Sequence, residues 1–155
     1  MREFPVENHQ PVFYLGQRTC DMSRKNMKPH IAILEDHVDT LEMLQIGLAT
    51  EFSISVYQSA VQLLAALENE NFSAILADIM LPGMDGFEFV RAVRRHPRYA
   101  NVCVIAVTAL AMTREREHGI AAGFTDFLIK PTTPDQITSA LKRWIASGPR
   151  KPSAA

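Results

Sequence analysis

Short apolar runs alternate along the chain with longer segments in which apolar residues recur at helical spacing. The runs are rich in isoleucine and valine and lie near residues 30–35, 53–57, 73–78, 102–107 and 125–129. Continuous runs of this length are typical of parallel strands that are buried on both faces. Helical patterns fill the gaps, at 39–50, 59–69, 86–96, 113–122 and 133–147. The alternation predicts an α/β fold: a doubly wound, five-stranded parallel sheet with right-handed crossovers and helices on both faces.

Several helix ends carry local signals. Ser59 begins a sequence typical of a capping box, and Pro97 stops the helix that precedes it. Gly123 suits the left-handed conformation that closes many helices, and Thr133-Pro134 suits a helix start. Asp85-Gly86 indicates a turn followed by a helix cap.

Composition places the chain among globular proteins. It has 155 residues, of which 47% are hydrophobic and 21% charged, and its net charge of −1 gives no argument for direct binding to nucleic acid or to anionic membranes. No apolar stretch approaches the roughly 20 residues that span a bilayer, and the first residues do not resemble a secretory signal. Of the two cysteines, we expect Cys103 in a core strand and Cys20 as a free thiol. We expect a cytoplasmic protein.

Polar residues follow four of the five predicted strands. Glu35-Asp36 follow the first strand, Asp78 the third, Thr108 the fourth and Lys130-Pro131 the fifth. In an open parallel sheet, ligands bind outside the carboxyl ends of the strands. If the first and third strands are neighbours, the three carboxylates form a cluster that needs a cation, because like charges repel. Oxygen ligands of this kind suit Mg²⁺.

The other two strand ends add a fixed positive charge and a hydroxyl donor, from Lys130 and Thr108. Together with carboxylates and a divalent cation, these groups form a site for phosphoryl oxygens. No serine or cysteine with a paired histidine lies at these strand ends, so the nucleophile must be a carboxylate. Asp78 is the best choice because it is central and leads into the turn at Pro82-Gly83.

With these residues, the sequence resembles the receiver domain of two-component response regulators. The matching segments are Glu35-Asp36, the run from Asp78 to Gly86, Thr108-Ala109 and Lys130-Pro131, and 30 residues separate Asp78 from Thr108. Each motif alone is weak, because an acidic pair is more often a solvated helix start, but their order and spacing together are specific. The resemblance covers roughly residues 29–147 and implies a flavodoxin-like strand order of 2-1-3-4-5. Residues 1–28 are then an irregular N-terminal extension, and 148–155 a disordered tail.

The resemblance implies a phosphoacceptor and a metal site. Asp78 would accept a phosphoryl group from a sensor histidine kinase or a histidine phosphotransfer protein. Asp36 and Asp78 would ligate Mg²⁺, for which Mn²⁺ can substitute, together with the backbone carbonyl of Met80. Glu35 would hold the ion mostly through water.

The resemblance also implies a phosphoryl-binding switch. Lys130 would pair with the phosphoryl oxygens, Thr108 with its neighbour Ala109 would move toward them, and Phe127 would follow Thr108 inward. The peptide bond between Lys130 and Pro131 would be cis.

Four positions depart from the common pattern of the family. Glu35 stands where aspartate is commoner, and Phe127 lacks the hydroxyl of a tyrosine. Met80 and Leu110 are apolar where side chains flank the path of a hydrolysing water. We therefore expect slow self-dephosphorylation, because neither side chain can orient that water.

The sequence thus predicts a stand-alone receiver domain that signals by contact, through the face built from roughly residues 112–147. It is not expected to be an enzyme beyond self-catalysed phosphotransfer and slow autodephosphorylation. The downstream target protein, phosphorylation-dependent homodimerisation and excision from a larger hybrid kinase remain open. A scaffold that is never phosphorylated is the alternative, whereas a phosphatase is disfavoured because Met80 cannot act as a general acid. The five histidines are expected at the surface, with His37 as a candidate for tuning the charge of the acidic pair.

Overall fold

Five strands and five helices alternate along the part of the chain that the structure describes, in the order and of the type predicted. The structure is a computed structural model, and it describes residues 27–109 and 112–148. The elements are β1 (His30–Leu34), α1 (Val38–Leu48), β2 (Ser53–Tyr57), α2 (Ala60–Ala66), β3 (Ala74–Ala77), α3 (Gly86–Arg95), β4 (Cys103–Thr108), α4 (Thr113–Ala122), β5 (Asp126–Ile129) and α5 (Pro134–Ala146).

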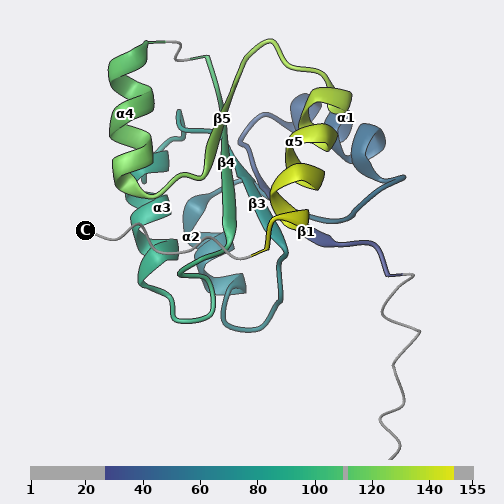
Figure 1. Ribbon diagram of the computed structural model, residues 1–155, viewed down its shortest axis with the longest axis horizontal. Helices are drawn as coiled ribbons and strands as arrows, with labels where there is room; N and C mark the ends of the chain where they lie inside the picture. Colours follow the sequence, from purple (N-terminus) through teal and green to yellow (C-terminus); the bar gives the residue numbers. More distant parts are fainter. Residues whose placement is uncertain (1–26, 110–111, 149–155) are drawn as a thin grey trace, which may run out of the picture.

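The strands form one parallel sheet in the order β2-β1-β3-β4-β5. Helices α1 and α5 cover one face, and α2, α3 and α4 cover the other (Figure 1). This is the flavodoxin-like order that the resemblance implied. Because the strand order reverses between β1 and β3, the carboxyl ends of these two strands mark the switch point where such sheets bind ligands.

Burial on both faces explains why the strands are continuous apolar runs. Along β1, Ile31 and Ile33 pack toward α1 and α5, whereas Ala32 and Leu34 pack toward α2 and α3. All four residues are almost fully buried. Successive side chains of a strand point to opposite faces, so a sheet covered on both sides needs apolar residues at every position. Cys103 of β4 is likewise buried in the core, as predicted.

Capping side chains fix most of the helix starts where the sequence predicted them. Asp85 and Glu88 form a complete capping box at α3, and Thr133 and Gln136 form one at α5. Ser59 accepts a hydrogen bond from the backbone N–H of Gln62 at the start of α2. Helix α2 nevertheless ends at Ala66 rather than near residue 69, because the following backbone N–H groups turn back to carbonyls of the last helical turn.

Two further features position the loops on the α3–α4 side. Gly123 ends α4 with a φ of 127°, a conformation that glycine adopts without strain. Arg94 of α3 donates hydrogen bonds to the carbonyls of Gly123 and Val102, both at 2.7 Å at the closest. Of the five histidines expected at the surface, His37 and His118 are exposed, His30 and His96 are half-buried, and His9 lies outside the described residues. Within the described ranges, the helices are too short or too polar to span a bilayer.

Candidate functional site

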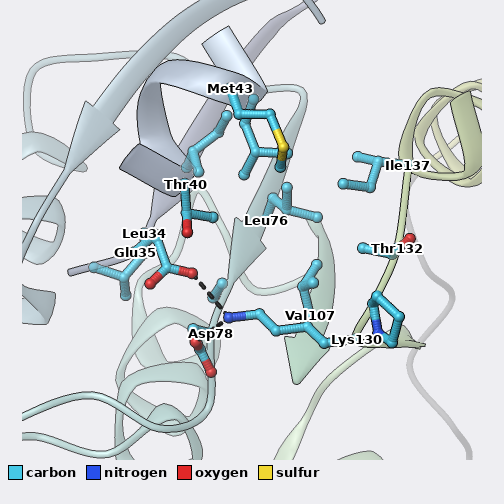
Figure 2. A pocket seen from close by; sticks show the side chains of 14 residues that line it. Leu34, Glu35, Thr40, Met43, Leu76, Asp78, Val107, Lys130, Thr132 and Ile137 are labelled. Carbon is cyan, nitrogen blue, oxygen red and sulfur yellow. Dashed lines mark hydrogen bonds and ion pairs between the residues drawn. The ribbon is translucent and has the colours of Figure 1, made fainter. Parts of the chain in front are cut away.

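The polar residues predicted from the strand ends do meet at one edge of the sheet. The sheet hydrogen bonds continue for one residue past the strands, since the backbone N–H of Asp78 donates to Leu34 and that of Lys130 donates to Thr108. The hydrogen bonding of the sheet therefore ends at Glu35, Asp78 and Lys130. The side chains of these three residues point toward one another (Figure 2). After these residues the chain leaves the sheet as loops, and the three side chains lie at the carboxyl edge of the sheet.

Lys130 links the two buried carboxylates. Its Nζ lies 2.7 Å from Oδ2 of Asp78 and 3.1 Å from Oε2 of Glu35. Glu35 is 3% exposed and Asp78 6% exposed, so both charges are largely removed from water. Burial lowers the pKa of Lys130, but the hydrogen bonds that its ammonium donates to Asp78 and then to Glu35 outweigh burial and leave that pKa raised. Lys130 is therefore a fixed ammonium at the site throughout the ordinary pH range.

Asp78 is held by a second contact on its other oxygen. Oδ1 accepts a hydrogen bond from the backbone N–H of Met80 at 2.9 Å. The two oxygens of the carboxylate thus face different donors, one from its own loop and one from Lys130. The side chain of Met80 itself points into solvent, with 62% of its surface exposed. The side chain of Met80 therefore places no polar group next to Asp78.

His37 lies against the acidic pair. Its Nδ1 is 3.0 Å from Oε1 of Glu35 and 3.0 Å from Oδ1 of Asp36. The hydrogen bond to Glu35, followed by the charge of Asp36, raises the pKa of His37. Among the described residues, Glu35, Asp36 and His37 form the group of three whose ligand atoms lie within 4.8 Å of one another. Asp78 is outside this group and is connected to Glu35 through Lys130.

Thr108 and Phe127 come from the adjacent strands β4 and β5. Thr108 is fully buried at the end of β4, and Ala109 after it is exposed. Phe127 is 6% exposed, with its ring 5.4 Å from the ring of Phe124. The Phe127 ring also abuts Gly119 of α4, where a Cβ atom would lie only 2.0 Å from Cζ. The aromatic is therefore buried beside α4 in this structure.

The Lys130–Pro131 peptide bond is cis, the isomer that the resemblance implied. Leu110, the second apolar residue expected beside the hydrolysis path, lies outside the described residues. Sequence reasoning did not find the close fit between Gly119 and Phe127. It noted His37 only as a neighbour of the acidic pair, although a histidine directly after two acidic residues was the available signal.

A cavity of about 520 Å³ opens beside Asp78 and Lys130, between α1 and α5 (Figure 2). Apolar side chains line most of it: Leu34, Met43, Leu44, Leu76, Val107 and Ile137. Walls of this kind keep the local dielectric low, which strengthens the interactions of Lys130 with its carboxylate partners.

Comparison with known proteins identifies the family. A family model described as the response regulator receiver domain matches residues 31–142. The chain belongs to this family. An uncharacterised 14.6 kDa protein of Leptolyngbya boryana is 32% identical over 120 residues, which are 77% of this chain and 92% of that protein. The sensor histidine kinase CheAY of Helicobacter pylori is 38% identical over 72 residues, which are 46% of this chain.

Receiver domains of known structure have the same fold. The receiver domain of the sensor histidine kinase PA1611 of Pseudomonas aeruginosa, solved with a magnesium ion coordinated in its active-site cleft, superposes with a TM-score of 0.71. It is 28% identical in sequence, over 77% of this chain and 98% of that one. The chain spans only 9% of CheAY and between 23% and 52% of several other curated relatives. In those proteins the matching region is one part of a longer chain.

Proposed function

We propose that this receiver domain is a signalling module switched by phosphorylation of Asp78. The observation that carries the proposal is the buried pair of carboxylates, Glu35 and Asp78, held by the single ammonium of Lys130. The phosphoryl donor is a sensor histidine kinase or a histidine phosphotransfer protein, as expected of a member of the family. One relative, CheAY, is itself named a sensor histidine kinase.

The transfer uses Asp78 as the nucleophile. A carboxylate oxygen attacks the phosphorus of a phosphohistidine, a P–O bond forms as the P–N bond breaks, and the electron pair of the P–N bond leaves with the protonated imidazole. Lys130 already lies 2.7 Å from one oxygen of Asp78, so its ammonium is placed to follow the phosphoryl oxygens. Thr108, at the end of the adjacent strand β4, supplies the hydroxyl.

The residues at the site fit a hard divalent cation. Oδ1 of Asp36 is buried, and its contact within the described residues is the ion pair with His37 at 3.0 Å rather than a hydrogen bond, so this oxygen keeps capacity for a cation. Asp36 and Asp78 with the backbone carbonyl of Met80 would hold Mg²⁺ or Mn²⁺, and Glu35 would contribute mostly through water. The ion would stabilise negative charge on the phosphoryl oxygens during transfer.

The signal is read on the face formed by α4, β5 and α5. Phosphorylation adds nearly two negative charges at Asp78 and biases an existing equilibrium between two conformations of this face. Phe127 connects the site to α4, because it lies on β5 and its ring packs against Gly119. Met112, Ile120 and Ile129 expose apolar surface on the α4–β5 side, which suits a downstream target protein or a second copy of the chain.

The alternative is a scaffold with a receiver fold that is never phosphorylated. In that case the ion pairs of Lys130 would serve stability alone. We further propose that the chain has no enzymatic activity on other phosphate esters, because the side chain of Met80 offers no proton for a leaving group. Turnover of a free phosphomonoester would contradict this part of the proposal.

The test is phosphorylation by acetyl phosphate in the presence and absence of Mg²⁺, followed by intact mass. Wild-type protein should gain the mass of one phosphoryl group only with Mg²⁺, and Asp78→Asn should gain none. Asp85→Asn is the matched control, because Asp85 is a helix cap and asparagine caps equally well. Equal labelling of the Asp78→Asn protein would refute Asp78 as acceptor. Absence of labelling in wild type, and of any Trp144 fluorescence response to beryllofluoride, would favour the scaffold.

A further inference from the structure

Asp126, the first residue of β5, is a buried carboxylate that the proposed function does not use. Only 9% of this residue is exposed, although β5 is an edge strand of the sheet. Its Oδ2 accepts hydrogen bonds from Nη2 of Arg143 at 2.6 Å and from Nε1 of Trp144 at 2.9 Å, both on α5. Its Oδ1 accepts a hydrogen bond from the backbone N–H of Phe127 at 2.8 Å. The orientation of the carboxylate is therefore fixed by β5 and α5.

The same carboxylate also reaches α4, which lies on the opposite side of β5 from α5 (Figure 1). Nη2 of Arg116 lies 3.7 Å from Oδ1 of Asp126. The guanidinium carbon of Arg116 lies over the ring of Phe127, 5.9 Å from the ring centroid, which is within the range of a cation–π contact. One arginine of α4 thus connects the carboxylate of Asp126 with the ring of the next residue.

Three neighbours enclose the ring of Phe127. Gly119 of α4 leaves the space that the ring occupies, and the ring of Phe124 packs against it with centroids 5.4 Å apart. The third neighbour is the guanidinium of Arg116. The side chain of Arg116 is 57% exposed, whereas Phe127 is 6% exposed, so the arginine lies on the solvent side of the ring.

A contact that is made in only one of two conformations favours that conformation by the free energy of the contact. When the ring of Phe127 leaves its buried site, it separates from the guanidinium of Arg116 and the cation–π contact is lost. The bonds of Asp126 to Arg143 and Trp144 involve no atom of the ring, so they persist when the ring moves. Arg116 therefore favours the buried position, and Asp126 keeps the guanidinium over the ring.

We propose that Arg116, anchored by Asp126, is a positioning residue of the phosphorylation switch and holds Phe127 in its buried position. The inference rests on the proposed function, in which phosphorylation of Asp78 draws Thr108 and then Phe127 inward. The buried ring corresponds to the inward position, so Arg116 stabilises the conformation that binds the phosphoryl group. Without this role, an arginine at the start of α4 would be part of a solvated helix face.

Binding of beryllofluoride, an anion that replaces the phosphoryl group, tests this role on the full chain. Arg116→Gln keeps a long side chain and a good helix propensity but removes the charge. Fluorine nuclear magnetic resonance of the bound anion in the presence of Mg²⁺ should show binding weakened by about threefold to tenfold, because a cation–π contact and an exposed ion pair are both lost. Arg114→Gln is the matched control: it removes the same charge from an exposed position of the same helix and should bind as wild type does.

A Phe127→Leu background separates a contact with the ring from a general effect of charge. Leucine has no aromatic face, so Arg116→Gln should change the affinity in this background by less than about twofold. An equal loss of affinity in the two backgrounds would overturn the proposal, because Arg116 would then act without the ring. Binding by Arg116→Gln as tight as that by Arg114→Gln would overturn it as well.

Hydroxyl-radical footprinting with peptide mass spectrometry measures the exposure of Phe127 without any phosphoryl analogue. Oxidation of Phe127 should rise by about twofold or more in Arg116→Gln and stay at the wild-type level in Arg114→Gln, because only the first substitution uncovers the ring. Unchanged oxidation in Arg116→Gln would overturn the proposal. Failure of wild type to bind beryllofluoride would reject the proposed function and the switching role that rests on it, whereas the footprint would still decide whether Arg116 holds the ring.

Discussion

Gly119 provides the space that the ring of Phe127 occupies, and a methyl group at this position should disturb the contact between α4 and β5. A Cβ atom built on Gly119 lies 2.0 Å from Cζ of Phe127 and 2.9 and 3.0 Å from its Cε atoms. Carbon atoms in contact are normally about 3.5–4.0 Å apart. The ring would have to retreat by about 1.5 Å or more, out of a site where Phe127 is almost fully buried.

Two effects of opposite sign determine the stability of Gly119→Ala. Overpacking in a core typically costs about 1–3 kcal/mol. Alanine in place of a helical glycine stabilises the helix by about 1 kcal/mol. In the wild-type background the sum ranges from near zero to about 2 kcal/mol of destabilisation. In a Phe127→Leu background, which lacks the Cζ atom, the helix term alone remains and the substitution should stabilise by up to about 1 kcal/mol.

A double-mutant cycle separates these terms. Urea unfolding of the wild type, the two single variants and the double variant, followed by circular dichroism, gives the coupling free energy between Gly119 and Phe127. We expect about 1–3 kcal/mol, because overpacking occurs only when alanine at 119 and phenylalanine at 127 are present together. Equal effects of Gly119→Ala in the two backgrounds, within about 0.5 kcal/mol, would show that the ring does not abut α4.

Three further predictions concern single residues. Burial raises the pKa of Cys103 from 9.0 to about 12, so the native thiol should resist alkylation at pH 8.5 and react after unfolding, as peptide mass spectrometry would show. The protonated thiol of Cys103 stabilises the native protein fully below the pKa of the thiol in the unfolded chain. This stabilisation is lost as pH rises from about 9 toward 12, because only the thiol of the unfolded chain ionises in that window. Arg94→Lys should destabilise by about 1–3 kcal/mol in thermal or urea unfolding, since an ammonium cannot reach the carbonyls of Gly123 and Val102 together; no loss would contradict this role. Met80→Asn should shorten the lifetime of the phosphorylated protein several-fold in a decay assay by offering a group that orients water, and an unchanged lifetime would remove Met80 from the explanation.

The fold could be predicted from the sequence because its strands are buried on both faces. An apolar run such as Ile31 to Leu34 has only one way to avoid water on both sides, between two layers of helices. Helix starts were predictable for a similar reason: the capping residues Asp85 and Thr133 act through local hydrogen bonds. The end of α2 was predicted less well, since the turn after Ala66 depends on backbone bonds that no side chain announces.

The candidate site was predictable at the level of strand ends and no further. Neighbouring strands of a parallel sheet bring their carboxyl ends together, so the meeting of Asp78 with Lys130 follows from topology. Which carboxylate oxygen faces which cationic group depends on side-chain rotamers. The spacing of residues along the sequence does not predict these rotamers. The position of His37 between Glu35 and Asp36 is such a case, because a ring at a helix start can turn to the helix or away from it.

On the proposed function, the charges at the site favour binding of the divalent cation before the phosphoryl donor arrives. Glu35, Asp36 and Asp78 carry three formal negative charges, and Lys130 contributes one positive charge, which leaves the pocket with a formal charge of −2. A phosphorylated histidine is itself anionic and would be repelled from such a pocket. A divalent ion brings the formal charge to zero, so only the loaded site presents no net repulsion to the donor. Lys130 cannot neutralise the pocket on its own, because its ammonium is already shared between Glu35 and Asp78. On the proposed function, the acidic pair and its cation would control the entry of the donor, and the ammonium would act afterwards, on the charge that the transfer creates.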